Sequence, residues 1–186
     1  EMCIRDSGNA GNLTHRQDKL IELSKSGHSV LIFDYSGFGH SRGVPNEEMC
    51  YANADTFVGF LLRKGYKKEN IIPYGESLGG AVASYVARKY NLPKVVLESS
   101  VPGIRELINV RFPRIKFLGV FFDEFNTTKY IDGYRGKTLV LHCVNDEVVP
   151  HESVQKLLNM ATESVDMDGS HNSPTIPWEK VLAFIA

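Results

Sequence analysis

Short apolar runs alternate with longer amphipathic stretches along most of the chain, and this pattern constrains the fold more than any other feature. The runs are rich in Val, Ile and Leu, and they predict strands over residues 29–33, 70–74, 94–97, 138–142 and 163–167. Apolar residues at helical spacing between them predict helices over 14–26, 47–64, 78–90, 153–161 and 177–186. Strands that are apolar along their whole length, each followed by a helix, are typical of a parallel sheet covered on both faces. The sequence therefore predicts a three-layer α/β/α fold with a mostly parallel central sheet.

The composition limits the classes of protein to consider. The 186 residues suit one domain with a sizeable core. With 42% hydrophobic residues, 23% charged residues and a net charge of −1, the chain lacks the basic excess that attracts nucleic acid. No apolar run approaches the roughly 18 residues of a membrane-spanning helix. The three cysteines, Cys3, Cys50 and Cys143, are far apart and are not spaced as metal-ligand pairs, which fits a reduced, cytoplasmic location.

The strongest local motif is Gly-Glu-Ser-Leu-Gly at residues 75–79, directly after a predicted strand and directly before a predicted helix. In that context a sharp strand-to-helix turn holds a serine hydroxyl clear of the sheet, where it can act as a nucleophile. Side chains at the flanking glycines would collide with the neighbouring strand and helix. We therefore predict Ser77 as the catalytic nucleophile, against the alternative of a tight turn that merely uses small residues.

A serine nucleophile needs a base that takes its proton and an acid that orients the base. Asp146 lies just past the end of the predicted strand 138–142, at the edge of the sheet where the serine is also expected. We predict Asp146 as this acid, with the adjacent Glu147 as its rival and a solvated turn residue as the simpler interpretation.

His171 is the predicted base because it follows the acid in the chain and stands in a Gly-Ser-His-Asn loop after a predicted strand. His151 also follows Asp146, but it opens a predicted helix and is more simply a capping or surface residue. The other four histidines precede the acid: His15, His28, His40 and His142.

Backbone donors must stabilise the oxyanion that forms when a serine attacks a carbonyl group. The N–H of Leu78, the residue after the nucleophile, is one expected donor. The glycine-rich loop 8–12 can supply a second donor, although by itself it is more simply a plain turn.

Together these motifs resemble the α/β-hydrolase superfamily, and more narrowly the bud-emergence-like and palmitoyl-thioesterase-like serine hydrolases. The segments that carry the likeness stand in the same order as in that family: 8–13, 33–41, 74–80, 139–150 and 169–172. The resemblance implies a hydrolase fold over residues 8–186. It also implies that Asn9 is the second oxyanion donor, that the loop 34–41 has a structural role beside the site, and that no metal or organic cofactor is needed.

Residues 1–7 depart from the family pattern. The family has His-Gly at the end of an apolar strand, whereas this chain has Ser7-Gly8 after the poor strand former Met2–Asp6. We predict a non-native leader here and an N-terminally truncated fragment. In this fold the missing strand would leave a gap in the middle of the sheet, unless residues 1–6 fill it. In a second departure, Cys143 replaces a usual glycine, which we interpret as packing.

Residues 101–135 break the strand-helix rhythm and are rich in Phe, Pro and Arg. We predict a small insertion over the carboxyl edge of the sheet, above the active site. Its aromatic residues form either a small satellite core or a lid that contacts acyl chains or a membrane surface.

The predicted activity is hydrolysis of a small-molecule carboxylic ester or acyl thioester through an acyl-serine intermediate. The same triad would also serve an aminopeptidase or amidase. From another class, the fold can act as a non-catalytic binding module, although the presence of all three triad residue types argues against that interpretation.

Overall fold

The computed structural model describes residues 2–6, 17–39, 41–44, 46–114 and 124–186. Six parallel strands form one sheet in the order β2-β1-β3-β4-β5-β6, and two short strands pair separately. The strands are β1 (Met2–Asp6), β2 (Ser29–Phe33), β3 (Ile71–Glu76), β4 (Lys94–Glu98), β5 (Lys137–Cys143), β6 (Glu163–Met167), β7 (Gly169–Ser170) and β8 (Ser173–Pro174). The helices are α1 (Gln17–Lys25), α2 (Glu47–Arg63), α3 (Gly79–Tyr90), α4 (Ile104–Arg111), α5 (Thr127–Ile131), α6 (Gln155–Met160) and α7 (Trp178–Ile185), with the 3-10 turns η2 (Lys68–Asn70) and η4 (His151–Val154).

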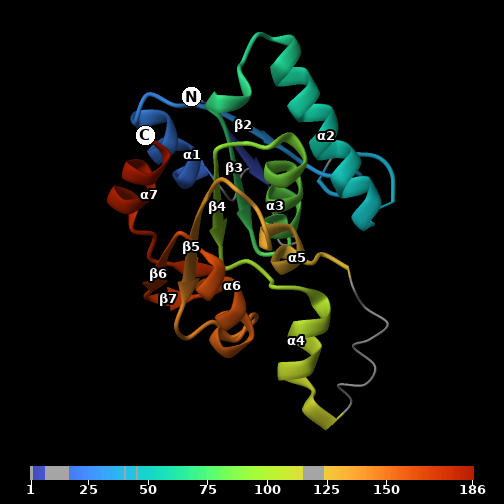
Figure 1. Cartoon of the computed structure of the whole chain (residues 1–186), viewed down its shortest axis with the longest axis vertical. Helices are drawn as coiled ribbons and strands as arrows, with labels where there is room; N and C mark the ends of the chain where they lie inside the picture. The colour runs from blue at the N-terminus through green and yellow to red at the C-terminus, as the bar shows by residue number, and fades with distance from the viewer. Residues whose placement is uncertain (1, 7–16, 40, 45, 115–123) are drawn as a thin grey trace.

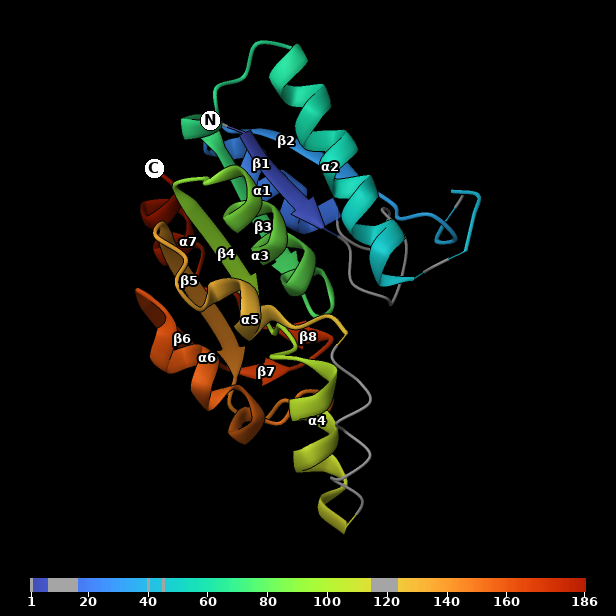
Figure 2. The same ribbon diagram turned by 45° about the vertical axis from the view of Figure 1, so that its right-hand side comes forward.

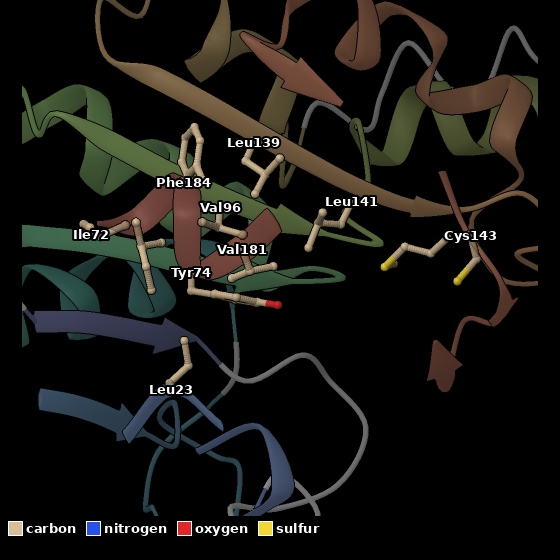
Figure 3. Close-up of a cluster of buried hydrophobic side chains, with 11 residues drawn as sticks. Leu23, Ile72, Tyr74, Val96, Leu139, Leu141, Cys143, Val181 and Phe184 are labelled. Carbon is tan, nitrogen blue, oxygen red and sulfur yellow. The ribbon is translucent and has the colours of Figure 1, made fainter. Parts of the chain in front are cut away.

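The two faces of the sheet are covered by different helices, which confirms the predicted three layers (Figure 1). Side chains alternate along a strand, so Val96 and Val95 of β4 point to opposite faces. Val96 belongs to a buried cluster that also contains residues of α1 and α7, including Leu23 and Val181 (Figure 3). Val95 packs with α3, α5 and α6, including Ala87. Both faces are therefore buried, as the continuous apolar strands predicted.

All five predicted strands are present with bounds shifted by at most two residues, and the predicted helices lie where their periodicity placed them. Local signals explain some of the ends. The Asn46 side chain accepts a hydrogen bond from the Met49 amide (2.8 Å) and so caps the start of α2. Past its end, Gly65 adopts a φ of 92°, a conformation that costs glycine little.

Strand β1 corrects the expectation that Met2–Asp6 is a poor strand. It pairs in parallel register with β2, from Met2 opposite Ser29 to Asp6 opposite Phe33, and on its other side with β3. Without it, β2 and β3 would have unpaired backbone groups along the sides that face each other, each costing about 1–3 kcal/mol when buried. The main-chain groups of a strand in this position form the missing hydrogen bonds with β2 and β3, whatever its side-chain pattern is.

The segment 101–135 contains α4 and α5, while residues 115–123 lie outside the described part. Helix α4 has no buried residue, and it projects beyond the carboxyl ends of the strands (Figure 2). Helix α5 is anchored to the body, because Thr127 Oγ1 donates to the Val101 carbonyl (2.5 Å) and Arg88 donates to the Lys129 carbonyl (2.9 Å). Within the described ranges, no helix has the length and apolar character that crossing a membrane requires.

Candidate active site

The turn between β3 and α3 holds Ser77 at the carboxyl edge of the sheet. Ser77 has a φ of 56°, in the left-handed region that costs a non-glycine residue about 1–2 kcal/mol. Two backbone hydrogen bonds fix the turn against the end of β4 and the chain after it: the Ser77 amide donates to the Glu98 carbonyl (3.0 Å), and the Val101 amide donates to the Ser77 carbonyl (3.2 Å). This is the geometry that the nucleophile-elbow motif predicts.

The glycines around the turn are required by close packing, as the sequence indicated. A Cβ atom at Gly75 would lie 2.3 Å from the Gly79 carbonyl oxygen, and one at Gly80 would lie 2.1 Å from Ser100 Oγ. Both distances are far inside van der Waals contact. The first neighbour is backbone and cannot move aside without deforming the turn.

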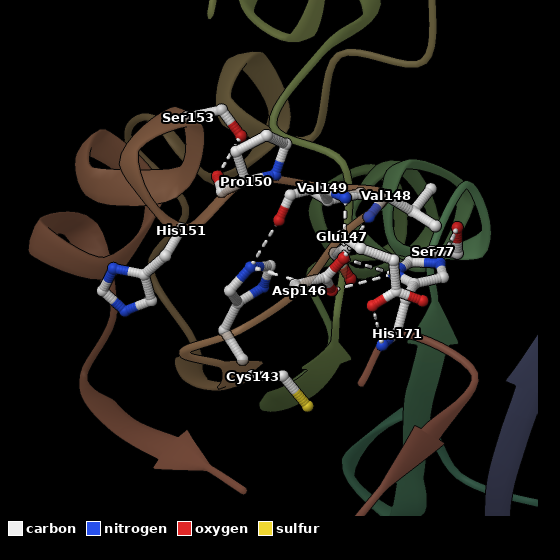
Figure 4. Close-up of polar contacts among 12 residues, drawn as sticks. Ser77, Cys143, Asp146, Glu147, Val148, Val149, Pro150, His151, Ser153 and His171 are labelled. Carbon is white, nitrogen blue, oxygen red and sulfur yellow. Dashed lines mark hydrogen bonds and ion pairs between the residues drawn. The ribbon is translucent and has the colours of Figure 1, made fainter. Parts of the chain in front are cut away.

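The structure brings Ser77, His171 and Asp146 together (Figure 4). His171 Nε2 lies 3.1 Å from Ser77 Oγ, and His171 Nδ1 lies 2.8 Å from Asp146 Oδ2 and 3.0 Å from Oδ1. A carboxylate only accepts, so Nδ1 carries hydrogen and donates to Asp146. In the neutral ring Nε2 is then free to accept the proton of Ser77. The three side chains come from three separate segments and are arranged to pass a proton.

The loop after β5 holds the Asp146 carboxylate in place. Asp146 Oδ1 accepts hydrogen bonds from the backbone amides of Val148 (2.9 Å) and Val149 (2.7 Å). Burial alone would raise the pKa of Asp146, but hydrogen bonds from His171 and these two amides outweigh it, so the pKa lies below its ordinary value. Asp146 is therefore a carboxylate at neutral pH.

The rival acid, Glu147, contacts His171 in a different way. Its Oε2 accepts from the His171 backbone amide (3.1 Å) and not from the ring. Glu147 therefore helps to hold the histidine loop, while Asp146 orients the imidazole. His151, the other downstream histidine, lies with its ring 3.2 Å from Asp166 Oδ1 and 3.0 Å from the Gln155 amide.

Of the two predicted oxyanion donors, Leu78 follows Ser77 at the start of α3, and Asn9 lies outside the described residues. Cys143 is a buried free thiol, with its Sγ 3.5 Å from the Ser170 carbonyl oxygen. It is the last residue of β5, and its thiol contacts the backbone of the loop that carries His171.

A charged cluster beneath the elbow was missed by the sequence analysis. Lys19, on the first turns of α1, forms ion pairs with Glu76 (2.8 Å) and with Glu98. Glu98 is 1% exposed and also accepts from the Tyr74 hydroxyl (2.6 Å). The cluster joins α1 to the ends of β3 and β4, and its residue Glu76 immediately precedes Ser77. No local motif signals it, because Lys19 is 57 and 79 residues away from its two partners.

Comparison with known proteins agrees with this architecture. The sequence profile of the alpha/beta hydrolase fold family matches residues 8–106. An uncharacterized mimivirus protein from Acanthamoeba polyphaga mimivirus is 30% identical over 94% of this chain and 68% of its own length. The chain therefore belongs to the α/β-hydrolase fold family.

Other relatives place the chain within that family without assigning an activity. Alpha/beta hydrolase domain-containing protein 17B of Xenopus laevis is 32% identical over 76% of this chain and 49% of its own length. An esterase of Pyrococcus furiosus has a similar structure, with a TM-score of 0.77 at 20% identity, over 100% of this chain and 82% of the esterase; at this identity the likeness shows the fold alone. The chain spans 61–68% of the mimivirus, yeast and mycobacterial relatives that it matches.

Proposed function

We propose that this chain carries the catalytic site of a serine hydrolase that cleaves carboxylic esters or acyl thioesters through an acyl-serine intermediate. The observation that carries the proposal is the unbroken line of contacts from Ser77 Oγ through His171 to Asp146. In this family fold, a strained serine in hydrogen-bonding contact with a carboxylate-held imidazole is suited to nucleophilic attack on a carbonyl group.

In the proposed mechanism, Ser77 Oγ attacks the substrate carbonyl carbon while His171 Nε2 takes the hydroxyl proton. Asp146 stabilises the imidazolium through Nδ1. The backbone N–H of Leu78 donates to the oxyanion, and Asn9 is the proposed second donor. His171 then gives the proton to the departing alcohol or thiol, and the acyl group stays on Ser77. A water molecule, deprotonated by the same imidazole, releases the carboxylic acid and restores the serine.

Labelling with a fluorophosphonate probe tests this proposal. The wild-type protein should be labelled at Ser77, and Ser77→Ala should not be labelled and should lose about 10⁶-fold in kcat. Ser24→Ala, on the exposed side of α1, is the matched control and should be labelled like wild type. Folded wild-type protein that stays unlabelled would contradict the proposed chemistry.

The preference for acyl substrates over amides is supported by α4. Leu107, Ile108 and Val110 are half-buried there, and Phe112, next after the helix, is 55% exposed. Apolar side chains of this kind beside the sheet edge suit a fatty chain. A panel of butyryl and palmitoyl thioesters, matched oxygen esters and aminoacyl amides tests the preference. Higher kcat/KM for palmitoyl thioesters would support the narrower thioesterase-like assignment, and faster cleavage of amides would contradict it.

We also propose peripheral contact of α4 with an anionic membrane surface and a cytoplasmic location. Exposed arginines stand beside the half-buried apolar residues of α4: Arg105, Arg111 and Arg114. The buried free thiols of Cys50 and Cys143 suit a reducing compartment. Co-sedimentation with vesicles containing phosphatidylserine tests the contact, because Arg111→Glu should weaken it. Equal binding to neutral vesicles would contradict an electrostatic contact.

A further inference from the structure

His142 lies directly behind the acid of the candidate triad. It belongs to β5, four residues before Asp146, and is 0% exposed. Its Nε2 lies 3.0 Å from the Val149 carbonyl oxygen. A carbonyl only accepts, so this nitrogen carries hydrogen and donates. The imidazole therefore fixes the loop after β5 from its buried side.

Val149 links this imidazole to the acid through its two backbone groups. Its carbonyl accepts from His142, and its amide donates to Asp146 Oδ1 (2.7 Å). A continuous chain of hydrogen bonds thus runs from the strand, through the backbone of the loop, to the carboxylate and on to His171 (Figure 4). Moving Val149 would move the acid and tilt the ring that faces Ser77.

The surroundings keep His142 uncharged. Burial lowers its pKa, against the opposing effects of its Val149 hydrogen bond and of Asp146, while His151 and His171 act in the same direction as burial. Its Nδ1 is buried and has no hydrogen-bond partner among the described residues, which fits a bare ring nitrogen. Asp146 Oδ2 lies 3.9 Å from His142 Nε2 and 2.8 Å from His171 Nδ1. Because His142 is neutral, the charge of the Asp146 carboxylate is available to stabilise the imidazolium form of His171.

We propose that His142 is a positioning residue, which holds Asp146 through Val149 and so sets the orientation of His171 toward Ser77. The inference rests on the hydrolase function proposed above. A positioning role differs from a packing role in what a substitution changes. If His142 only packed, replacing it would affect the stability of the fold and leave the rate per folded molecule unchanged.

Two substitutions at His142 separate these roles. His142→Phe keeps a ring of similar size and removes the donor, and His142→Gln keeps a donor at the place of Nε2. We expect the Phe variant to lose about 10- to 100-fold in kcat/KM per active site, as misplaced catalytic groups do, and the Gln variant to stay within about 3-fold of wild type. His28→Gln, at a half-buried histidine whose ring contacts Ser26 and not the candidate site, is the control.

The pH–rate profile gives a readout that packing would not change. The His171 ring faces Asp146, and its backbone amide faces Glu147. A displaced carboxylate stabilises the imidazolium less, so the acid limb of kcat/KM should move to lower pH in the Phe variant and stay in place in the Gln variant.

The outcomes are distinguishable. If wild-type protein is neither labelled nor active, the proposed function fails. If wild type is active and the folded Phe variant keeps its rate and its acid limb, the positioning role is overturned. If His142→Phe does not fold, His142→Leu is measured in the same way, and failure of both to fold would also overturn the proposal by showing that the residue holds the fold and not the site.

Discussion

Helices α3 and α4 follow adjacent parallel strands and begin at the same edge of the sheet, yet their environments are opposite. Eight of the twelve residues of α3 are buried, whereas none of the eight residues of α4 is buried. The buried set in α3 is largely Gly and Ala, which lets the helix lie close against β3 and β4. Helix α4 projects away from the body (Figure 2).

The difference separates two needs of a site at a sheet edge. A proton transfer requires its groups to be held within a fraction of an ångström, and the turn that leads into α3 is packed accordingly. Contact with a flexible apolar ligand requires surface that is apolar and accessible, and under the proposed function α4, which has no buried residue, would supply it. Substitutions in the two regions should therefore differ strongly in their effects.

Replacing Lys19 should give the largest difference in the free energy of unfolding from a matched substitution in α4. Lys19→Met leaves the buried carboxylate of Glu98 close to Glu76 without their shared cation, and removing one partner of a buried ion pair costs about 3 kcal/mol or more. Arg105→Met, on the exposed side of α4, should change the free energy of unfolding by less than about 0.5 kcal/mol. Urea denaturation measures both, and similar values for the two variants would remove the contrast.

Adding one methyl group tests the packing of the elbow. Gly75→Ala places a Cβ against the backbone of Gly79 and Gly80, so we expect a loss of about 3 kcal/mol and a slower reaction with the fluorophosphonate probe. The control is Gly59→Ala within α2, where only the mobile end of Arg63 lies near. That variant should gain about 0.5–1 kcal/mol through higher helix propensity. A stable, fully reactive Gly75→Ala protein would show that the turn can relax.

A matched pair of valines compares the two helices directly. Val86→Ala in α3 removes two buried methyl groups and should cost about 2 kcal/mol. Val110→Ala in α4 should cost well under half of that, because its side chain is already partly in water. Thermal or urea unfolding distinguishes them, and equal losses would mean that α4 is packed as firmly as α3.

Lowering the pH should have the smallest and most gradual effect on the free energy of unfolding. The pKa of Asp146 in the folded protein lies below the ordinary 3.8, so its contribution to stability is complete above that pH and is lost as the pH falls through the lower folded value. Unfolding measured from pH 6 to pH 3 should show this loss in wild type and in Val110→Ala. Asp146→Asn should give a flatter curve. A wild-type curve as flat as that of the Asn variant would contradict the stabilised carboxylate.

Much of the fold and of the candidate site could be predicted because both depend on short-range patterns. A strand buried on both faces is an apolar run, so β3, β4 and β5 were found directly. Ser77 was predicted from the glycines beside it. Asp146 and His171 were predicted because each follows a predicted strand in the order that this fold requires, and the structure brings the three side chains into contact.

The remaining features depend on contacts that local patterns do not record. Met2–Asp6 becomes a strand because the slot between β2 and β3 needs a main chain. The helix α4 was not predicted, although Ile104, Leu107 and Ile108 have helical spacing, because the aromatic and proline content of the segment obscured it. The roles of Lys19 and His142 follow only from their partners, which belong to other segments or to the backbone of a loop.

The backbone angle of Ser77 has an evolutionary consequence. A residue without a Cβ would occupy that left-handed conformation more comfortably, so Ser77→Gly would relieve strain while deleting the hydroxyl. At this one position, natural selection for a folded chain and for a reactive one favour different amino acids. A lineage in which the activity is no longer selected should accept glycine there early. Its proteins would then be inactive and more stable.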